Sequence, residues 1–409
     1  MRRVFMGALC ILALTSLGEA QRPSTDVTQW RGPARDGVIT GVAAPQTWPE
    51  TLVQKWNVDV GTGYATPLVV GNRVYQFSRI GENETMTALD ADSGKVTWQS
   101  GYAASFAMNP ATKQHGPGPK STPVFSGGRL YSIGMTGIVT AWDASTGKQL
   151  WQKPGSGPEM QYTTHAFSPL VDGDRVIFHV GGHDKGALTA FDVNTGTVRW
   201  TWTGDGPGYA SPVVADLGGT RQVVVPTQTK IVGVDASTGA LLWERPLVHQ
   251  FVSNSITPVV NGQTVIVAGT GPLLAFVVAR RGAQWTTEQL WENTELPLRF
   301  TTPVASGDLL FGLSGRNSGQ YYAMDAKTGK TLWTSEGRQA AHASVARAGN
   351  VLFSLESDGE LVVARTSQTA FEPIRRYTVA TSETWAQPAI SGNRVFVKDV
   401  TSLTLWTWN

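Results

Sequence analysis

The sequence predicts an all-β protein, an eight-bladed β-propeller of four-stranded blades whose ring is closed by an N-terminal strand. Three observations predict it. A nine-residue turn pattern recurs along the chain, an opening pattern with proline recurs between the turns, and each chain end holds only part of a unit. The composition agrees, because 45 glycines and 15 tryptophans supply turns and large packing surfaces, and 16% charged residues is low for a globular protein.

The turn pattern reads Asp-x-x-x-Gly-x-x-x-Trp. An apolar strand ends at the aspartate, whose side chain can cap the turn, and the glycine takes the positive φ of a tight hairpin. The copies span residues 90–98, 143–151, 192–200, 235–243 and 325–333, and Trp291 and Tyr377 hold the same place in degenerate copies. We expect the tryptophans on the closing strands to dock structurally against the neighbouring blade; they are Trp56, Trp98, Trp151, Trp200, Trp243, Trp291 and Trp333.

The opening pattern is a small polar residue, a proline, an apolar pair, a glycine turn and an apolar strand. Its prolines are Pro67, Pro123, Pro169, Pro212, Pro258, Pro303 and Pro388, and Val345 fills the eighth place without proline. The last unit reaches the end of the chain before its closing strand, whereas residues 52–58 have no opening strands before them. Residues 52–58 are therefore expected to complete the last blade, which removes an open sheet edge.

Three segments are expected: a signal peptide over residues 1–20, an N-terminal arm over 21–50 and the propeller over 51–409. A basic start and an apolar run over residues 4–17 are typical of a cleaved secretory signal, and the run is shorter than the ~20 residues of a membrane span. The one cysteine, Cys10, lies inside this signal without the small residue before it that a lipoprotein signal requires. We expect a periplasmic or secreted monomer that is not a lipoprotein and has no disulfide.

Charge and histidine placement disfavour two classes of site. The formal net charge is +2 and no long run of one sign occurs, so nucleic acid and anionic membrane surfaces are poor partners. His179 and His183 lie four residues apart, but an apolar strand leads there into a Gly-Gly turn, where the two side chains are not expected to converge. We therefore expect no metal site.

Residues just before each opening strand should gather at one mouth of the central channel, because the first strand of a propeller blade is the innermost. Solvation alone favours Ser, Asp, Glu and Lys, whereas this set is rich in residue types that favour recognition of a ligand or peptide. The alternative is a loop ring that is polar only because it meets water. The expected funnel residues are Tyr64, Lys120, His165, Tyr209, Asn254, Arg299, His342 and Trp385, with His115 from the longest insertion folding over the same mouth.

The repeated units Ala-x-Asp-x-x-(Thr/Ser)-Gly-x-x-x-Trp resemble the PQQ-type repeat of quinoprotein dehydrogenases, which many non-enzymatic propellers share. The segment over residues 30–37 resembles the lead-in of PQQ-like propellers of unassigned function. Size, blade number and export resemble the propeller lipoprotein of the outer-membrane β-barrel assembly machine, which is a scaffold for a partner membrane protein; its lipid-bearing cysteine is missing here. The more distant resemblance is to quinoprotein alcohol dehydrogenases, which carry a vicinal disulfide and bind calcium through Glu, Asn and Asp. Here cysteine chemistry is excluded and no calcium ligand can be assigned.

The sequence thus favours a non-catalytic binding or scaffold protein that holds an envelope protein or a small ligand at the funnel. No catalytic residue and no cofactor are expected. The alternative is an oxidoreductase of alcohols or sugars that uses PQQ with calcium, and a third interpretation is a purely structural part of an envelope complex. Fold alone does not decide among them.

Overall fold

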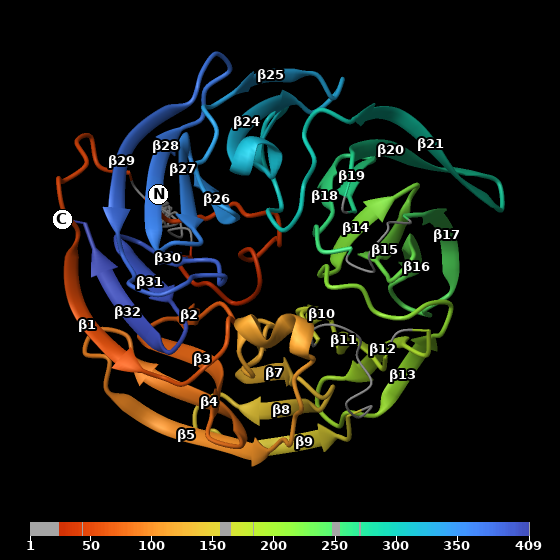
Figure 1. Cartoon of the computed structure of the whole chain (residues 1–409). Helices are drawn as coiled ribbons and strands as arrows, with labels where there is room; N and C mark the ends of the chain where they lie inside the picture. The colour runs from red at the N-terminus through yellow and green to blue at the C-terminus, as the bar shows by residue number, and fades with distance from the viewer. Residues whose placement is uncertain are drawn as a thin grey trace, which may run out of the picture.

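Eight four-stranded antiparallel sheets stand around one axis as blades, so the predicted fold class is confirmed (Figure 1). The computed structural model describes residues 24–42, 44–155, 165–182, 184–247, 254–269 and 271–408; the expected signal peptide, Cys10 and His183 lie outside these ranges. Within them the only helices are two short 3-10 turns, η1 (Pro110–His115) and η2 (Arg316–Ser318). None of the helices described is long and apolar enough to cross a membrane.

Seven blades use four strands that follow one another in the chain, from the innermost strand outward. The first four blades consist of β2 (Leu68–Val70), β3 (Arg73–Ile80), β4 (Asn83–Asp90) and β5 (Val96–Ala103); β6 (Val124–Ser126), β7 (Arg129–Ile133), β8 (Val139–Asp143) and β9 (Gln149–Lys153); β10 (Leu170–Asp172), β11 (Arg175–Val180), β12 (Ala187–Asp192) and β13 (Val198–Trp202); β14 (Val213–Leu217), β15 (Thr220–Pro226), β16 (Lys230–Asp235) and β17 (Leu241–Pro246). The next three consist of β18 (Val259–Asn261), β19 (Thr264–Ala268), β20 (Leu273–Arg281) and β21 (Gln284–Asn293); β22 (Val304–Ser306), β23 (Leu309–Ser314), β24 (Gln320–Asp325) and β25 (Thr331–Thr334); β26 (Ala343–Ala348), β27 (Val351–Glu356), β28 (Glu360–Arg365) and β29 (Glu372–Thr378).

The eighth blade joins the two ends of the chain. It consists of β30 (Ala389–Ser391), β31 (Arg394–Lys398), β32 (Ser402–Thr407) and, outermost, β1 (Val53–Asp59). β1 pairs antiparallel with β32, from Val53 opposite Thr407 to Asp59 opposite Ser402. The predicted closure by residues 52–58 is therefore confirmed.

Tryptophan and glycine of the turn pattern meet across the blade boundary. An ideal Cβ on Gly94 would stand 2.7 Å from the indole of Trp56 in the preceding blade, which leaves no room for a side chain. Gly94 also has a φ of 70°, which glycine adopts without strain. The same glycine-on-indole contact joins Gly147 to Trp98, Gly196 to Trp151, Gly239 to Trp200 and Gly329 to Trp291.

Six of the seven docking tryptophans also donate their indole N–H to a backbone carbonyl of the next blade. The pairs are Trp56 to Ala91, Trp98 to Ala144, Trp151 to Val193, Trp200 to Ala236, Trp291 to Ala326 and Trp333 to Ser367, at 2.9 to 3.2 Å. Trp243 differs, because the fifth blade lacks the Asp-x-x-x-Gly turn that would receive it. Its Nε1 donates to Gln222 Oε1 within its own blade, and its ring packs on Phe276 with centroids 5.5 Å apart.

Tyr377 does not hold the tryptophan position. Trp98 lies opposite Ala88, just before the bulge in its blade, and the equivalent residue beside the bulge between β28 and β29 is Arg375 opposite Val363. Tyr377 lies two residues further along and donates its hydroxyl to the Pro49 carbonyl at 2.6 Å. The register at this bulge therefore places Arg375, and not the aromatic Tyr377, at the position equivalent to the docking tryptophans.

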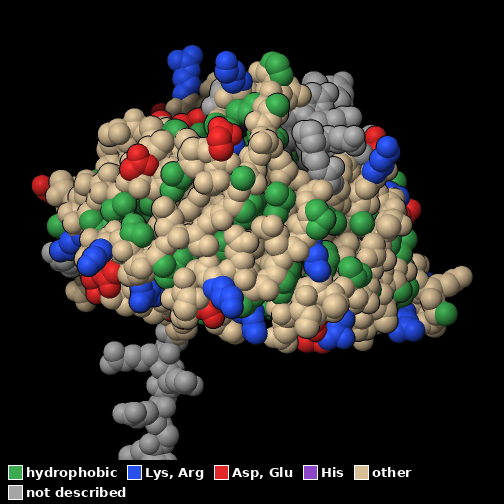
Figure 2. Space-filling model, turned by 90° about the horizontal axis from the view of Figure 1, so that it is seen from below, with side chains coloured by type: hydrophobic (Ala, Val, Ile, Leu, Met, Phe, Trp, Pro, Cys, Tyr) green, Lys and Arg blue, Asp and Glu red, His purple; other side chains and the backbone are tan. Residues whose placement is uncertain are grey.

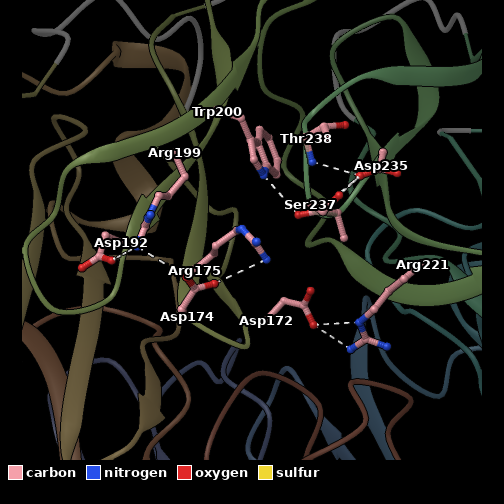
Figure 3. A network of polar contacts seen from close by, with 11 residues as sticks. Asp172, Asp174, Arg175, Asp192, Arg199, Trp200, Arg221, Asp235, Ser237 and Thr238 are labelled. Carbon is pink, nitrogen blue, oxygen red and sulfur yellow. Dashed lines mark hydrogen bonds and ion pairs between the residues drawn. The ribbon is translucent and has the colours of Figure 1, made fainter.

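The aspartate of each turn caps it as predicted. Asp235 Oδ1 accepts the backbone N–H groups of Ser237 at 2.8 Å and Thr238 at 2.9 Å. Figure 3 shows this turn beside Trp200, together with ion pairs of the third and fourth blades, among them Arg221 to Asp172 at 2.6 Å. Elsewhere on the rim, Lys, Arg, Asp and Glu side chains lie scattered without a broad patch of one sign in the view of Figure 2.

A series of hydroxyl bonds links the inner strands from blade to blade. The Ser or Thr before each opening proline accepts the backbone N–H of the equivalent residue in the preceding blade. The series runs from Gln387 to Thr66 (3.1 Å), Thr66 to Thr122 (3.0 Å), Thr122 to Ser168 (3.0 Å), Ser168 to Ser211 (3.1 Å), Ser211 to Thr257 (3.3 Å) and Thr257 to Thr302 (3.1 Å). The small polar residue of the opening pattern therefore fastens neighbouring blades together.

Residues 24–42, the described part of the N-terminal arm before residue 43, run inside the ring (Figure 1). Backbone hydrogen bonds join this segment to Val69, Phe125 and Arg347 of the first, second and seventh blades. Its side chains bond residues just before the inner strands of the third to sixth blades. The arm thus bonds seven of the eight blades at the centre of the ring.

Candidate functional site

A cavity of about 360 Å³ opens at the mouth of the ring formed by the loops that precede the inner strands. Its described lining comes from these loops and from Trp30 of the arm, so the arm bounds the cavity on its channel side. The lining residues are Trp30, Tyr64, Thr112, His115, Lys120, Ala166, Ser168, Tyr209, Ser211, Ser255, Thr257, Phe300, His342, Ala343, Ser344 and Trp385.

The lining follows one register. In each of the eight blades the residue three positions before the opening proline, or before Val345 in the seventh blade, faces the cavity. These eight residues are Tyr64, Lys120, Ala166, Tyr209, Ser255, Phe300, His342 and Trp385. Six of the nine expected funnel residues therefore meet at one cavity, namely Tyr64, Lys120, Tyr209, His342, Trp385 and His115.

His165, Asn254 and Arg299 do not line the cavity, and their placement there was wrong. Each lies one residue earlier than the facing register. His165 and Asn254 are buried, and the Asn254 side-chain amide donates to the carbonyls of Thr227 (2.8 Å) and Leu247 (3.1 Å). Arg299 is exposed. In these three blades the next residue along the chain lines the cavity instead, namely Ala166, Ser255 and Phe300.

Aromatic rings from neighbouring blades cluster around Trp385. The His342 ring stacks on Trp385 with centroids 3.4 Å apart, and His115 and Phe300 meet it edge-on at 5.1 Å and 5.3 Å. Tyr64 lies 6.4 Å from it on the other side of the blade boundary. Burial lowers the pKa of His342 to about 4, so this imidazole is neutral at pH 7 and presents an apolar face.

Lys120 is the cation among the described lining residues, and its charge is already engaged. Its Nζ donates to the carbonyls of His115 (2.7 Å), Gly116 (3.1 Å) and Gly118 (3.2 Å). It also lies 5.0 Å from the centre of the Tyr64 ring. Burial lowers the pKa of Lys120 to about 8, against an opposing effect of the Glu383 carboxylate. Lys120 therefore fastens the insertion that carries His115 over the cavity mouth.

Across the cavity from the aromatic cluster, the third to fifth blades contribute hydroxyl groups. Ser168, Ser211 and Thr257 are members of the hydroxyl series, and Ser255 lies beside them. Trp30 Nε1 donates to Thr257 Oγ1 at 3.2 Å, which places the arm against this wall. The third to fifth blades therefore contribute mainly hydroxyl groups, with the Tyr209 ring among them, and most of the other rings come from the first and the sixth to eighth blades.

Two arginines of the arm hold the backbone beneath the cavity. Arg35 donates to the carbonyls of Ser168 (2.9 Å), Pro169 (2.8 Å) and Pro212 (2.7 Å). Arg31 donates to those of Thr302 (3.2 Å) and Pro303 (2.7 Å). Burial lowers the pKa of Arg31 to about 10 and, with repulsion from Arg31, that of Arg35 to about 9. Both remain charged at pH 7.

Sequence reasoning missed Trp30, Phe300 and the hydroxyl wall. The Ser or Thr before each proline was visible as a pattern, and the shared register of the prolines would have selected Phe300 over Arg299. Trp30 left no comparable signal, because its partner Thr257 lies 227 residues away.

The described lining does not fit the calcium-assisted quinone site of the PQQ dehydrogenases. A calcium ion needs several oxygen ligands with carboxylates among them. The described residues that line the cavity include neither Asp, Glu nor Asn, and no cluster of His, Asp and Glu elsewhere in the described chain could hold a metal ion. The cavity offers hydroxyl donors and aromatic faces instead.

Comparison with solved structures gives the same architecture in two functional settings. BamB from Moraxella catarrhalis matches with a TM-score of 0.64 at 18% identity, over 87% of this chain and 98% of that one. The quinohemoprotein alcohol dehydrogenase ADHIIG from Pseudomonas putida HK5 matches with 0.64 at 13%, over 94% and 80%. A europium-containing methanol dehydrogenase matches with 0.60 at 15%, over 92% and 90%.

At these identities the solved structures support the fold alone. No curated protein gives a significant sequence match. A family model does match: residues 82–335, well over half of the chain, fit the family described as outer membrane protein assembly factor BamB. The chain, a propeller of PQQ-like repeats, belongs to the family of outer membrane protein assembly factor BamB.

Proposed function

We propose that this protein is an exported, non-catalytic binding propeller that holds a partner-protein segment or a small ligand in the funnel. The observation that carries the proposal is the aromatic cluster around Trp385, set in a cavity of about 360 Å³ that the arm bounds. Volumes of roughly this size hold small ligands or a few side chains. Aromatic residues grouped in one concave site are typical of binding hot spots.

Family membership supports a scaffold role in the cell envelope. The family is described as an outer membrane assembly factor, so the expected partner is a protein of that compartment. The mouth of the ring is formed by loops, which carry binding residues more often than the strands that position them. Export rests on the signal-like residues 1–20, and mass spectrometry of the mature N-terminus tests it.

A quinoprotein oxidoreductase is the alternative, and the favourable observation is the equal TM-score of the quinohemoprotein dehydrogenase. The lining chemistry speaks against it, because the calcium ion of such a site needs carboxylate ligands and the described lining residues include neither Asp nor Glu. Fold similarity without the residues of the site is a weak argument for shared chemistry.

The test is capture by the wild-type protein and two tryptophan variants. Bait purified from its own envelope extract is examined by mass spectrometry for retained proteins and small molecules. Trp385→Ala should lose the retained molecule, since truncated hot spots commonly cost about 2 kcal/mol or more. Trp285→Ala is the matched control, because Trp285 lies on the β20–β21 hairpin away from the cavity and packs against Arg280. Equal capture by the two variants would contradict the funnel as the binding site.

A further inference from the structure

We propose that the funnel takes the carboxylate group of a ligand whose body is aromatic or apolar. This rests on the binding function proposed above and specifies the class of ligand. The carrying observation is a wall of buried hydroxyl donors that faces the aromatic cluster across one cavity, above two buried guanidinium groups.

Thr257 gives the clearest donor. Its Oγ1 accepts the backbone N–H of Ser211 at 3.3 Å and the indole N–H of Trp30 at 3.2 Å. A hydroxyl has two lone pairs and one hydrogen, so both lone pairs are taken and only the hydrogen is left to bond. The side chain is 1% exposed, and no acceptor for that hydrogen occurs in the described part of the chain. Thr257 can therefore only donate to a molecule in the cavity.

Ser168 and Ser211 belong to the same series in the two preceding blades, but each keeps one lone pair free and can accept as well as donate. Each Oγ accepts one backbone N–H, at 3.0 Å and 3.1 Å, and neither hydroxyl hydrogen has an acceptor among the residues described. Trp385 Nε1, on the aromatic side, is buried and likewise without a partner there. Buried donors without acceptors cost free energy that a matching ligand recovers.

A carboxylate is the matching group. Its two oxygens accept up to about four hydrogen bonds and donate none. Among the described lining groups, Thr257 Oγ1 and Trp385 Nε1 can only donate, whereas the serine hydroxyls can also accept. Thr257 and Trp385 Nε1 therefore favour a ligand group that accepts several hydrogen bonds, as a carboxylate does.

The charge beneath the cavity has the complementary sign. Arg35 bonds the carbonyl of Ser168 itself, and Arg31 bonds that of Thr302, the next member of the hydroxyl series after Thr257. Neither guanidinium forms an ion pair within the described ranges, and the Asp36 carboxylate acts on Arg31 alone, where it raises the pKa against the effect of burial. Charges buried in this way are weakly screened by solvent. The Glu383 and Asp399 carboxylates act on Tyr64, on the aromatic side, and neither lines the cavity.

The aromatic cluster accounts for the rest of the ligand. Phe300, the most exposed of its rings at 49%, and Trp385 offer faces and edges to an aromatic or aliphatic body. A free acid and the carboxyl terminus of a polypeptide share this chemistry, so the test distinguishes the two sources.

The experiment is calorimetric titration of the full chain with four probes. N-acetylphenylalanine and a short peptide ending in phenylalanine carry the carboxylate, and their C-terminal amides are the matched neutral forms. Each acid should bind about tenfold more tightly than its amide or better, and its affinity should fall with added salt. Preference for the peptide acid over N-acetylphenylalanine would identify a polypeptide terminus as the source, and the reverse would identify a small acid.

Two variants of the hydroxyl series test the donor wall. Thr257→Val and Thr122→Val each remove a hydroxyl that accepts a backbone N–H, but only Thr257 lines the cavity, and Thr257→Val also removes the bond from the Trp30 indole. Thr257→Val should lose most of the preference for the acid, and Thr122→Val should keep it. Trp385→Phe, which retains a ring and removes the N–H, gives a second reading if the threonine variants do not fold.

Equal binding of acid and amide, no binding of either acid, or an equal preference in Thr257→Val, Thr122→Val and Trp385→Phe would overturn the carboxylate proposal. The binding function survives such a result if Trp385→Ala still abolishes capture from the envelope extract. If Trp385→Ala also leaves capture unchanged, both proposals fail.

Discussion

An ideal Cβ on Gly147 would lie 2.4 Å from the ring of Trp98, whereas one on Gly127, in the same blade, would meet nothing within 4 Å. Both glycines have positive φ, 75° and 55°. Gly127→Ala should therefore cost only the backbone strain, about 1 kcal/mol. Gly147→Ala should cost that plus overpacking against Trp98, about 3 kcal/mol together. Chemical denaturation measures the difference in the free energy of unfolding. Equal losses in the two variants would show that the Trp98 indole moves aside without cost.

Truncation separates the arm from the closing strand. Removing residues up to 42 deletes the segment of the arm inside the ring and leaves β1 paired with β32, so we expect a lower melting temperature and a monomer. Removing residues up to 60 also exposes the edge of β32, and we expect unfolding or aggregation through it. Light scattering and thermal melts read both outcomes. A monomer of unchanged melting temperature after the longer truncation is incompatible with this role of β1.

Incubation with PQQ and calcium tests the oxidoreductase alternative. We expect no dye-linked oxidation of alcohols or sugars above the cofactor-only control, because the described lining offers calcium no carboxylate ligand. Turnover together with the absorbance of a bound quinone would promote the oxidoreductase over the binding protein.

Acid should destabilise the ring through His179. Burial lowers the pKa of His179 to about 4, from 6.5 for an ordinary histidine. Between pH 6.5 and 4 the unfolded state binds a proton that the folded state does not, so stability falls as pH falls through this window. The loss from this one group is about 3 kcal/mol at most.

His179→Gln is the control for the acid effect, since glutamine can bond the Asp205 carbonyl that His179 Nε2 contacts at 3.1 Å, yet it does not titrate. Its free energy of unfolding should decline less between pH 6.5 and 4 than that of the wild type. Parallel declines would mean that other groups carry the acid sensitivity.

The fold was predictable because its signals are local and repeated. Asp235, Gly239 and Trp243 follow one another within nine residues, and their turn forms as expected. The contacts of Trp243, in contrast, could not be predicted from its own repeat. Its docking depends on a turn in the next blade, and the fifth blade has the long β20–β21 hairpin there instead. A repeat predicts the strands of its own blade better than it predicts the contacts between neighbouring blades.

The position of the cavity was predictable from the sequence, and the register of its lining residues was not. Asn254 and Arg299 were selected for their chemical type, while the ring geometry selects the residue after each of them, Ser255 and Phe300. The position of the arm inside the ring could not be predicted either, for a different reason. Arg31 and Arg35 bind backbone carbonyls, which every residue possesses, so no complementary side-chain pattern marks their partners.

The central position of the arm also has a consequence for the order in which the chain folds. It is the first described segment to leave the ribosome, yet the carbonyls that Arg35 binds lie 133 to 177 residues downstream and those that Arg31 binds in the sixth blade lie 271 and 272 residues downstream. Arg35 therefore stays in water until the opening of the fourth blade has been synthesised and Arg31 until the opening of the sixth, and contacts of such long range form slowly. The oldest described part of the chain is therefore among the last to reach its native contacts.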